Sequence, residues 1–219
     1  MSTAIVYCGL SDGFVIGSDS LVLNYQTGAI QTDKERKIFA FENPSISGIF
    51  AWSGTTIAIG SGGRGVLISL IRETYKILAV INFQDFANDF NARLNDRISI
   101  LEVNRTRDIA RGIFLYYWMG IQIECRITIF ANGRTWESKI DFFGPPTGKV
   151  VIMCGGDPDE FDDPHSLGFG KNIIEAYIQA SIDDPKYKCI GGKPQIGKLT
   201  TEGFSWLTVD PYLSFTTEI

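Results

Sequence analysis

The amino-terminal stretch places a hydroxyl residue and a carboxylate at one end of a predicted hairpin. Thr3 precedes the apolar run 4–10, and a second apolar run, 14–20, follows the pair Asp12-Gly13 and ends around Asp19. Asp-Gly between two apolar runs favours a tight antiparallel turn. Because the second strand runs back along the first, Thr3 and Asp19 are expected at the same end of the hairpin.

Two further segments could complete a hydrolytic site. Lys37 belongs to the basic cluster 34–37, and strand alternation places it on the opposite face from Arg36, so it can point inward. The small-residue turn Ser53-Gly54 can offer a backbone N–H to a developing oxyanion. A nucleophile, an acid, an amine and an oxyanion turn are the parts of a hydrolase whose own terminal amine serves as the base.

Composition limits the class of protein. The chain has 219 residues, 44% of them hydrophobic, which is enough for a sizeable core. No linker, repeat or low-complexity tract interrupts it, so we predict a single domain, 1–219. The net charge of −5 and the lack of a basic stripe argue against a nucleic-acid partner. No apolar run is long enough to span a membrane, and Asp12 and Asp19 interrupt any signal peptide, so we expect a soluble cytoplasmic protein.

The cysteines and the single histidine do not form a metal-binding pattern. Cys8, Cys125, Cys154 and Cys189 are far apart, and His165 has no neighbouring ligand. A zinc site of the usual kind needs clustered Cys and His residues. We therefore expect reduced thiols, no metal and no cofactor.

The predicted elements follow the order strands, two helices, strands, helix, strands. A first helix is expected from Thr55 or Thr56 to about Leu78, although its glycine-rich opening, 60–65, is a poor helix sequence. Apolar residues at three- and four-residue steps predict the second helix over 83–101 and the third over 171–181. Strands are expected at 4–10, 14–20, 37–41, 46–52, 113–118, 121–130, 135–142, 150–154, 196–200 and 204–209, with a short hairpin within 21–32. This order indicates an α+β fold of two packed antiparallel sheets with outer helices.

Four segments together resemble proteasome-type β subunits and their bacterial HslV relatives, which are amino-terminal-nucleophile (Ntn) hydrolases. They are the hairpin 3–20 with its Asp-Ser end, the Lys-x-x-Lys-Ile-Phe stretch 34–39, the strand 50–54 ending in Ser-Gly, and the Gly-Gly of 190–192. The resemblance implies a four-layer α-β-β-α sandwich, a homo-oligomeric ring, and a possible partner ATPase or cap.

The resemblance also implies a role for each candidate residue. Thr3 becomes the nucleophile, whose freed α-amine takes the hydroxyl proton directly or through a water. Asp19 faces Lys37 and holds it, and the Lys37 ammonium lowers the pKa of the Thr3 hydroxyl. The backbone N–H of Gly54 donates to the oxyanion.

The start of the chain leaves three alternatives open. Met1 and Ser2 precede Thr3, whereas the mechanism requires a free amine on the nucleophile. Removal of Met1 would expose Ser2, which becomes the nucleophile if the hairpin absorbs one extra residue. Alternatively, the leader is cleaved between Ser2 and Thr3. If nothing is cleaved, the protein is inert as a protease.

Supporting residues of the family are only partly matched. Cys154, in the turn Cys154-Gly155-Gly156, stands where the family has a serine. Asp184 could serve as the supporting aspartate after a loop insertion, but Ile190 cannot replace a hydroxyl. Losses of this kind loosen a site.

Three functions follow from these residues. The first is a threonine-type hydrolase, a peptidase acting on a peptide or other amide substrate. The second is a catalytically inactive structural or assembly subunit that keeps the fold. The third is a small-molecule amidase of the same fold, because peptidases and amidases share the nucleophile chemistry.

Overall fold

The computed structural model describes residues 5–23, 27–43, 46–54, 57–60, 63–66, 83–100, 110–118, 120–143, 150–154 and 170–208. The chain forms two compact units. Unit 1 comprises Met1–Ser53, Phe114–Glu124 and Gly144–Ile219, and unit 2 comprises Gly54–Ile113 and Cys125–Phe143.

Unit 1 contains a five-stranded sheet with the strand order β12-β1-β2-β13-β14. Its strands are β1 (Ile5–Leu10), β2 (Gly13–Ser18), β12 (Val150–Cys154), β13 (Gln195–Thr200) and β14 (Gly203–Trp206). Neighbouring strands are antiparallel. Ile5 pairs with Ser18 and Leu10 pairs with Gly13, so the predicted amino-terminal hairpin is confirmed.

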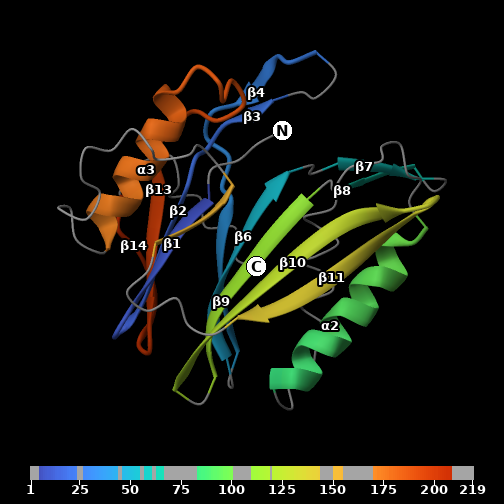
Figure 1. Ribbon diagram of the computed structural model, residues 1–219, viewed down its shortest axis with the longest axis horizontal. Helices are drawn as coiled ribbons and strands as arrows, with labels where there is room; N and C mark the ends of the chain where they lie inside the picture. Colours follow the sequence, from blue (N-terminus) through green and yellow to red (C-terminus); the bar gives the residue numbers. More distant parts are fainter. Residues whose placement is uncertain are drawn as a thin grey trace. The chain divides into compact units, whose positions relative to one another are not determined.

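Helix α3 (Lys171–Asp183) covers one face of this sheet (Figure 1). Alternate residues of the strands face the helix, and the resulting core consists of Val6, Cys8, Val15, Ile173, Ile174, Ile178, Ile190 and Ile196. Gly17 lies directly under the helix, because an added Cβ would press against Ile178 Cδ1 and Ile174 Cγ2. A residue without a side chain therefore allows α3 to lie close to β2.

A second five-stranded sheet has the order β11-β10-β9-β6-β5. Its strands are β5 (Ile38–Asn43), β6 (Ile46–Gly54), β9 (Ala110–Trp118), β10 (Ile121–Asn132) and β11 (Thr135–Phe143). β5 and β6 are antiparallel, from Ile38 opposite Ala51 to Asn43 opposite Ile46. β9 and β10 contribute residues to both units.

Within unit 1, the residues that alternate with the α3-facing set contact strands of the second sheet. The Tyr7 hydroxyl donates a hydrogen bond of 2.7 Å to Glu124 Oε1 of β10, and both residues are buried. The Phe14 ring meets the Tyr117 ring of β9 edge-on, with centroids 6.0 Å apart. Period-two alternation along β1 and β2 thus separates a helix-facing surface from a sheet-facing surface.

Unit 2 contains α2 (Phe83–Ile98), which lies along β11 (Figure 1). Its buried residues Phe90, Leu94 and Ile98 follow the predicted helical spacing. Ser138 of β11 ties the sheet to the helix, since its N–H donates to Asn95 Oδ1 at 2.6 Å and its hydroxyl donates to Asn91 Oδ1 at 2.7 Å.

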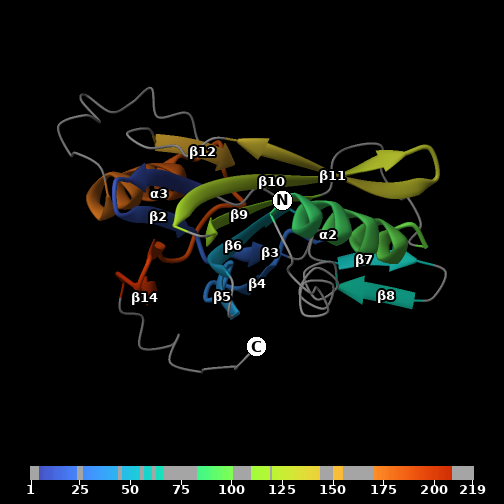
Figure 2. The same ribbon diagram turned by 90° about the horizontal axis from the view of Figure 1, so that it is seen from below.

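Two short antiparallel hairpins complete the described elements. In unit 1, β3 (Val22–Leu23) and β4 (Ile30–Thr32) form the hairpin predicted within 21–32. In unit 2, β7 (Ile57–Gly60) and β8 (Gly63–Val66) form a second one, seen clearly in Figure 2. The helix predicted from residue 55 is therefore wrong over 57–66. The glycines of 60–65 disfavour a helix and suit a tight reversal; the rest of that prediction, 67–78, lies outside the described residues.

The fold is α+β, with antiparallel sheets and helices α2 and α3 in the described part of the chain. The other two predicted helices are found, α2 ending three residues before the expected end and α3 extending two residues beyond it. Neither of them is long and apolar enough to cross a bilayer.

Candidate functional site

Asp19 and Lys37 form a buried ion pair in unit 1. Asp19 directly follows β2, and Lys37 directly precedes β5. Lys37 Nζ lies 3.0 Å from both Asp19 Oδ1 and Asp19 Oδ2. Asp19 is 0% exposed and Lys37 is 6% exposed. The structure thus joins two of the candidate residues, 18 positions apart in sequence, at the ends of two strands.

Backbone groups of the described residues add hydrogen bonds to this pair. Asp19 Oδ2 accepts hydrogen bonds of 3.2 Å from the N–H groups of Leu21 and Gly191. Lys37 Nζ donates to the Leu21 carbonyl at 2.7 Å. Three acceptors therefore surround the three protons of the ammonium, which suits a fixed positive charge.

Burial and pairing act in opposite directions on the two pKa values. Burial raises the pKa of Asp19, while the charge and hydrogen bond of Lys37 and the two backbone N–H groups lower it. Burial lowers the pKa of Lys37, while the charge and hydrogen bond of Asp19 raise it. For both residues burial is the largest effect, so on balance the pKa of Asp19 is raised and the pKa of Lys37 is lowered. The pair is therefore poorly solvated, and a charge in such a site is weakly screened and acts strongly on nearby groups.

Ser20 ties three loops together beside the pair. Its hydroxyl donates to the Asp33 carbonyl at 2.6 Å and accepts from Lys193 N at 2.8 Å. Its N–H donates to the Gly191 carbonyl at 3.1 Å. Gly192 has a φ of 77°, and an added Cβ would press against Ser20 Oγ and lie 2.6 Å from the Asp33 carbonyl oxygen. Glycine is thus required here for conformation and for space.

Gln195 and Ser18 are two buried polar residues that the sequence did not indicate. They are partners across β13 and β2 and are 1% and 0% exposed. Gln195 bonds the backbone on both sides of Arg36, since its Nε2 donates to the Glu35 carbonyl at 2.7 Å and its Oε1 accepts from Lys37 N at 3.5 Å. Ser18 Oγ has no hydrogen-bond partner among the described residues. The sequence carried a signal for Gln195, because residues two apart share a face of a strand, and Gln195 thus shares one with Gly197 and the fully buried Leu199 of β13.

The other candidate residues are placed less completely or elsewhere. Ser2, Thr3 and His165 lie outside the described residues. Gly54 ends β6 directly after the buried Ser53. Cys154 ends β12, where its Cα pairs with Ile5, and only its backbone is described.

Asp184 lies in a local turn at the end of α3. Its N–H donates to the Ala180 carbonyl at 3.0 Å, and its Oδ1 accepts from Lys186 N at 2.8 Å. These bonds cap the helix and shape the turn that follows. The structure therefore shows Asp184 in a capping position and not among the groups bonded to Asp19 or Lys37 in the described residues.

Comparison with known proteins identifies the fold. No protein-family model and no curated protein matches the chain. Among solved structures, Anbu from Yersinia bercovieri, described as an ancestral beta-subunit, has a TM-score of 0.57 and 14% identity over 95% of this chain and 89% of its own. A Gly-1 mutant of Anbu from Hyphomicrobium sp. strain MC1 has a TM-score of 0.57 and 11% identity over 94% of this chain and 85% of its own. The chain thus has a proteasome-like β-subunit fold; at this identity the likeness concerns the fold alone.

Proposed function

We propose that this chain is a threonine-type Ntn hydrolase that cleaves peptide bonds, with Thr3 as its nucleophile once Met1 and Ser2 are removed. The observation that carries the proposal is the buried Asp19–Lys37 pair beside the end of β2. Ile5, the first residue of β1, pairs with Ser18 at that end. Two residues span at most about 7 Å, so the proposal needs only that the chain before Ile5 continue along β2 toward Asp19.

The reaction needs only groups that the chain supplies. The Thr3 hydroxyl attacks the amide carbonyl carbon, and its proton passes to the free α-amine of Thr3. The ammonium so formed gives the proton to the leaving amine as the C–N bond breaks, which leaves an ester on Thr3. A water then attacks the ester with the α-amine as base, releases the acid and restores the hydroxyl.

Lys37 contributes charge in this scheme, and it does not act as the base. Its ammonium already has Asp19 Oδ1, Asp19 Oδ2 and the Leu21 carbonyl as acceptors within 3.0 Å. A positive charge held in a poorly solvated site stabilises a developing alkoxide on a neighbouring hydroxyl. The base is therefore assigned to the terminal amine.

The remaining assignments belong to the proposal. Gly54 N–H donates to the oxyanion, Cys154 replaces the family's serine, and Asp184 has at most an indirect role through its turn. The proposal also includes a four-layer α-β-β-α sandwich and a homo-oligomeric ring, with or without an ATPase or cap, which the fold likeness supports. A cytoplasmic location is a further part of the proposal. Light scattering on the purified protein tests the ring, which requires a mass that is a multiple of the 24.3 kDa chain.

The decisive experiment combines intact mass with a threonine-directed covalent inhibitor. We expect the mature chain to begin at Thr3 and to gain one inhibitor mass there. Thr3→Ala abolishes both inhibitor labelling and cleavage of fluorogenic peptides. The matched control is Thr201→Ala, at an exposed position in the turn between β13 and β14, which leaves both unchanged.

Three outcomes would contradict the proposal. A mature chain that keeps Met1 and is not labelled by the inhibitor indicates a structural or assembly subunit. A chain that begins at Ser2 and is labelled there makes serine the nucleophile. A labelled chain that hydrolyses small amides and leaves peptides intact is an amidase of the same fold.

A further inference from the structure

The buried amide of Gln195 is attached to the short segment that carries Lys37. Gln195 begins β13 and is 1% exposed. Its Nε2 donates to the Glu35 carbonyl at 2.7 Å, and its Oε1 accepts the longer 3.5 Å bond from Lys37 N. One side chain therefore bonds both ends of the three-residue segment 35–37.

Gln195 and Asp19 reach Lys37 from neighbouring strands. Gln195 pairs with Ser18 across β13 and β2, and Asp19 is the next residue after Ser18. Asp19 holds the Lys37 ammonium, and Gln195 holds the Lys37 backbone. A lysine has a long flexible stem, so an ion pair at its tip fixes its charge only if its backbone is also fixed.

We propose that Gln195 is a positioning residue that holds segment 35–37 so that the Lys37 ammonium stays on Asp19. In catalysis it acts through Lys37 and does not touch the substrate; this part rests on the proposed function. The amide occupies a buried strand position, where polar groups persist only with satisfied hydrogen bonds.

The first test does not depend on activity. In the crystal structure of Gln195→Met, which keeps the side-chain length and removes both bonds, we expect segment 35–37 to shift. The Lys37 Nζ to Asp19 distance should then exceed 4 Å. An unchanged ion pair in this variant overturns the proposal, whether or not the wild type is a hydrolase.

The second test is kinetic. With peptide substrate, Gln195→Met should lower kcat by about 10- to 100-fold, because small misplacements of a catalytic group cost this much. KM should stay within about twofold, since Lys37 acts on the nucleophile and not on substrate binding. A raised KM with unchanged kcat overturns the positioning role.

Two controls separate positioning from loss of stability. Gln179→Met makes the same substitution at an exposed position on α3 and should leave kcat unchanged. Leu199→Ala removes a fully buried side chain from the same strand without touching segment 35–37. If Leu199→Ala lowers kcat as much as Gln195→Met, the effect of Gln195 is merely structural and the proposal fails.

A second variant covers the case in which Gln195→Met does not fold. Gln195→Glu keeps the acceptor for Lys37 N–H and removes the donor to the Glu35 carbonyl. We expect a displacement of Glu35 and a smaller loss of kcat than for Gln195→Met. An unchanged position of Glu35 and an unchanged kcat would contradict the assignment.

Discussion

Asp19 and Lys37 depend on each other because both side chains are almost entirely buried. The Asp19 carboxylate and the Lys37 ammonium are buried, and among the described residues the backbone of Leu21 and Gly191 provides further partners. Removing one member leaves the other charge buried and unbalanced, which is among the costliest changes a core can undergo.

This dependence gives a prediction on stability. Asp19→Leu and Lys37→Met should each lower the free energy of unfolding by about 3–5 kcal/mol, measured by urea denaturation. The double variant should recover only part of the loss. It leaves the Gly191 N–H and the Leu21 carbonyl without the partners they have now, and each unpaired group costs about 1–3 kcal/mol. The Leu21 N–H keeps its 3.0 Å bond to the Gly191 carbonyl.

Asp12→Asn provides the control, because it alters an ion pair at the surface. Lys198 Nζ lies 2.8 Å from Asp12 Oδ2, where Asp12 is largely exposed, and little change is expected. A double variant as stable as the wild type would show that the backbone bonds around Asp19 contribute nothing.

At this scale the sequence indicated the ion pair but not the groups that hold it. Asp19 and Lys37 stand at strand ends, and the resemblance to proteasome-type β subunits implied that they face each other. Gln195 and Ser20 bond mainly to backbone atoms of distant segments. Such bonds depend on loop paths, which residue types do not specify.

Helix α3 and the sheet beneath it are matched at a single glycine. Gly17 leaves room for Ile178 Cδ1 and Ile174 Cγ2 on the face of β2. Overpacking a core forces side chains and backbone apart and costs roughly 1–3 kcal/mol. The close approach of α3 to β2 thus depends on the lack of a side chain at Gly17.

A double-mutant cycle tests this contact between elements. Gly17→Ala should lower the free energy of unfolding by about 1–3 kcal/mol. Ile178→Val alone should cost about 0.5–1.5 kcal/mol, but in the Gly17→Ala background it should cost less or stabilise, because it removes one of the two methyl groups that collide. Thermal unfolding of the four proteins measures the coupling, and strictly additive losses would refute the predicted collision.

Elements with a strong period were predictable, and the glycine-rich segment was not. Phe90, Leu94 and Ile98 identify α2 through their spacing, and Asp12-Gly13 identifies the first hairpin. The stretch from residue 57 to residue 66 combines a helix-compatible start with four glycines, and the local cost of glycine prevails. The spacing of apolar residues predicts which face of an element is buried, and it says little in a glycine-rich stretch, where few residues carry a side chain.

At the scale of the whole molecule, two strands run through both compact units. β9 and β10 contribute residues to unit 1 and to unit 2. A strand that is paired along its length does not melt at one end without weakening the other. We therefore propose that the chain unfolds as one cooperative domain.

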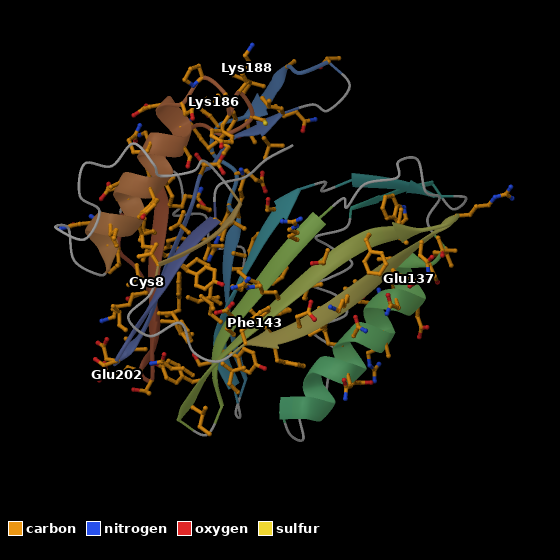
Figure 3. All side chains as sticks on the ribbon, viewed as in Figure 1. Cys8, Glu137, Phe143, Lys186, Lys188 and Glu202 are labelled. Atoms are coloured by element: carbon orange, nitrogen blue, oxygen red, sulfur yellow. The ribbon has the colours of Figure 1, made fainter. Side chains whose placement is uncertain are left out.

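Two buried thiols allow this to be measured. Cys8 of unit 1 and Cys125 of unit 2 are not in disulfides and are 0% and 2% exposed, and burial raises the pKa of the Cys8 thiol. Figure 3 shows Cys8 on β1. Both should resist iodoacetamide in the folded protein and become alkylated at the same urea concentration, as followed by peptide mass spectrometry.

Cys189 is the internal control for this experiment. It is not in a disulfide and is partly exposed, so it should be alkylated before any unfolding. Alkylation of Cys8 and Cys125 at clearly different urea concentrations would mean that the two units open separately, and that the chain is better described as two domains.

The hydrogen bond from Tyr7 to Glu124 has a consequence for how the chain selects one arrangement of strands. Apolar faces tolerate sliding, because a valine can replace an isoleucine as a neighbour at small cost. A slide of two residues would carry the Glu124 carboxylate away from the Tyr7 hydroxyl and into hydrocarbon, at a cost of several kcal/mol. The buried acid therefore favours one alignment of β1 against β10, two strands that belong to different sheets.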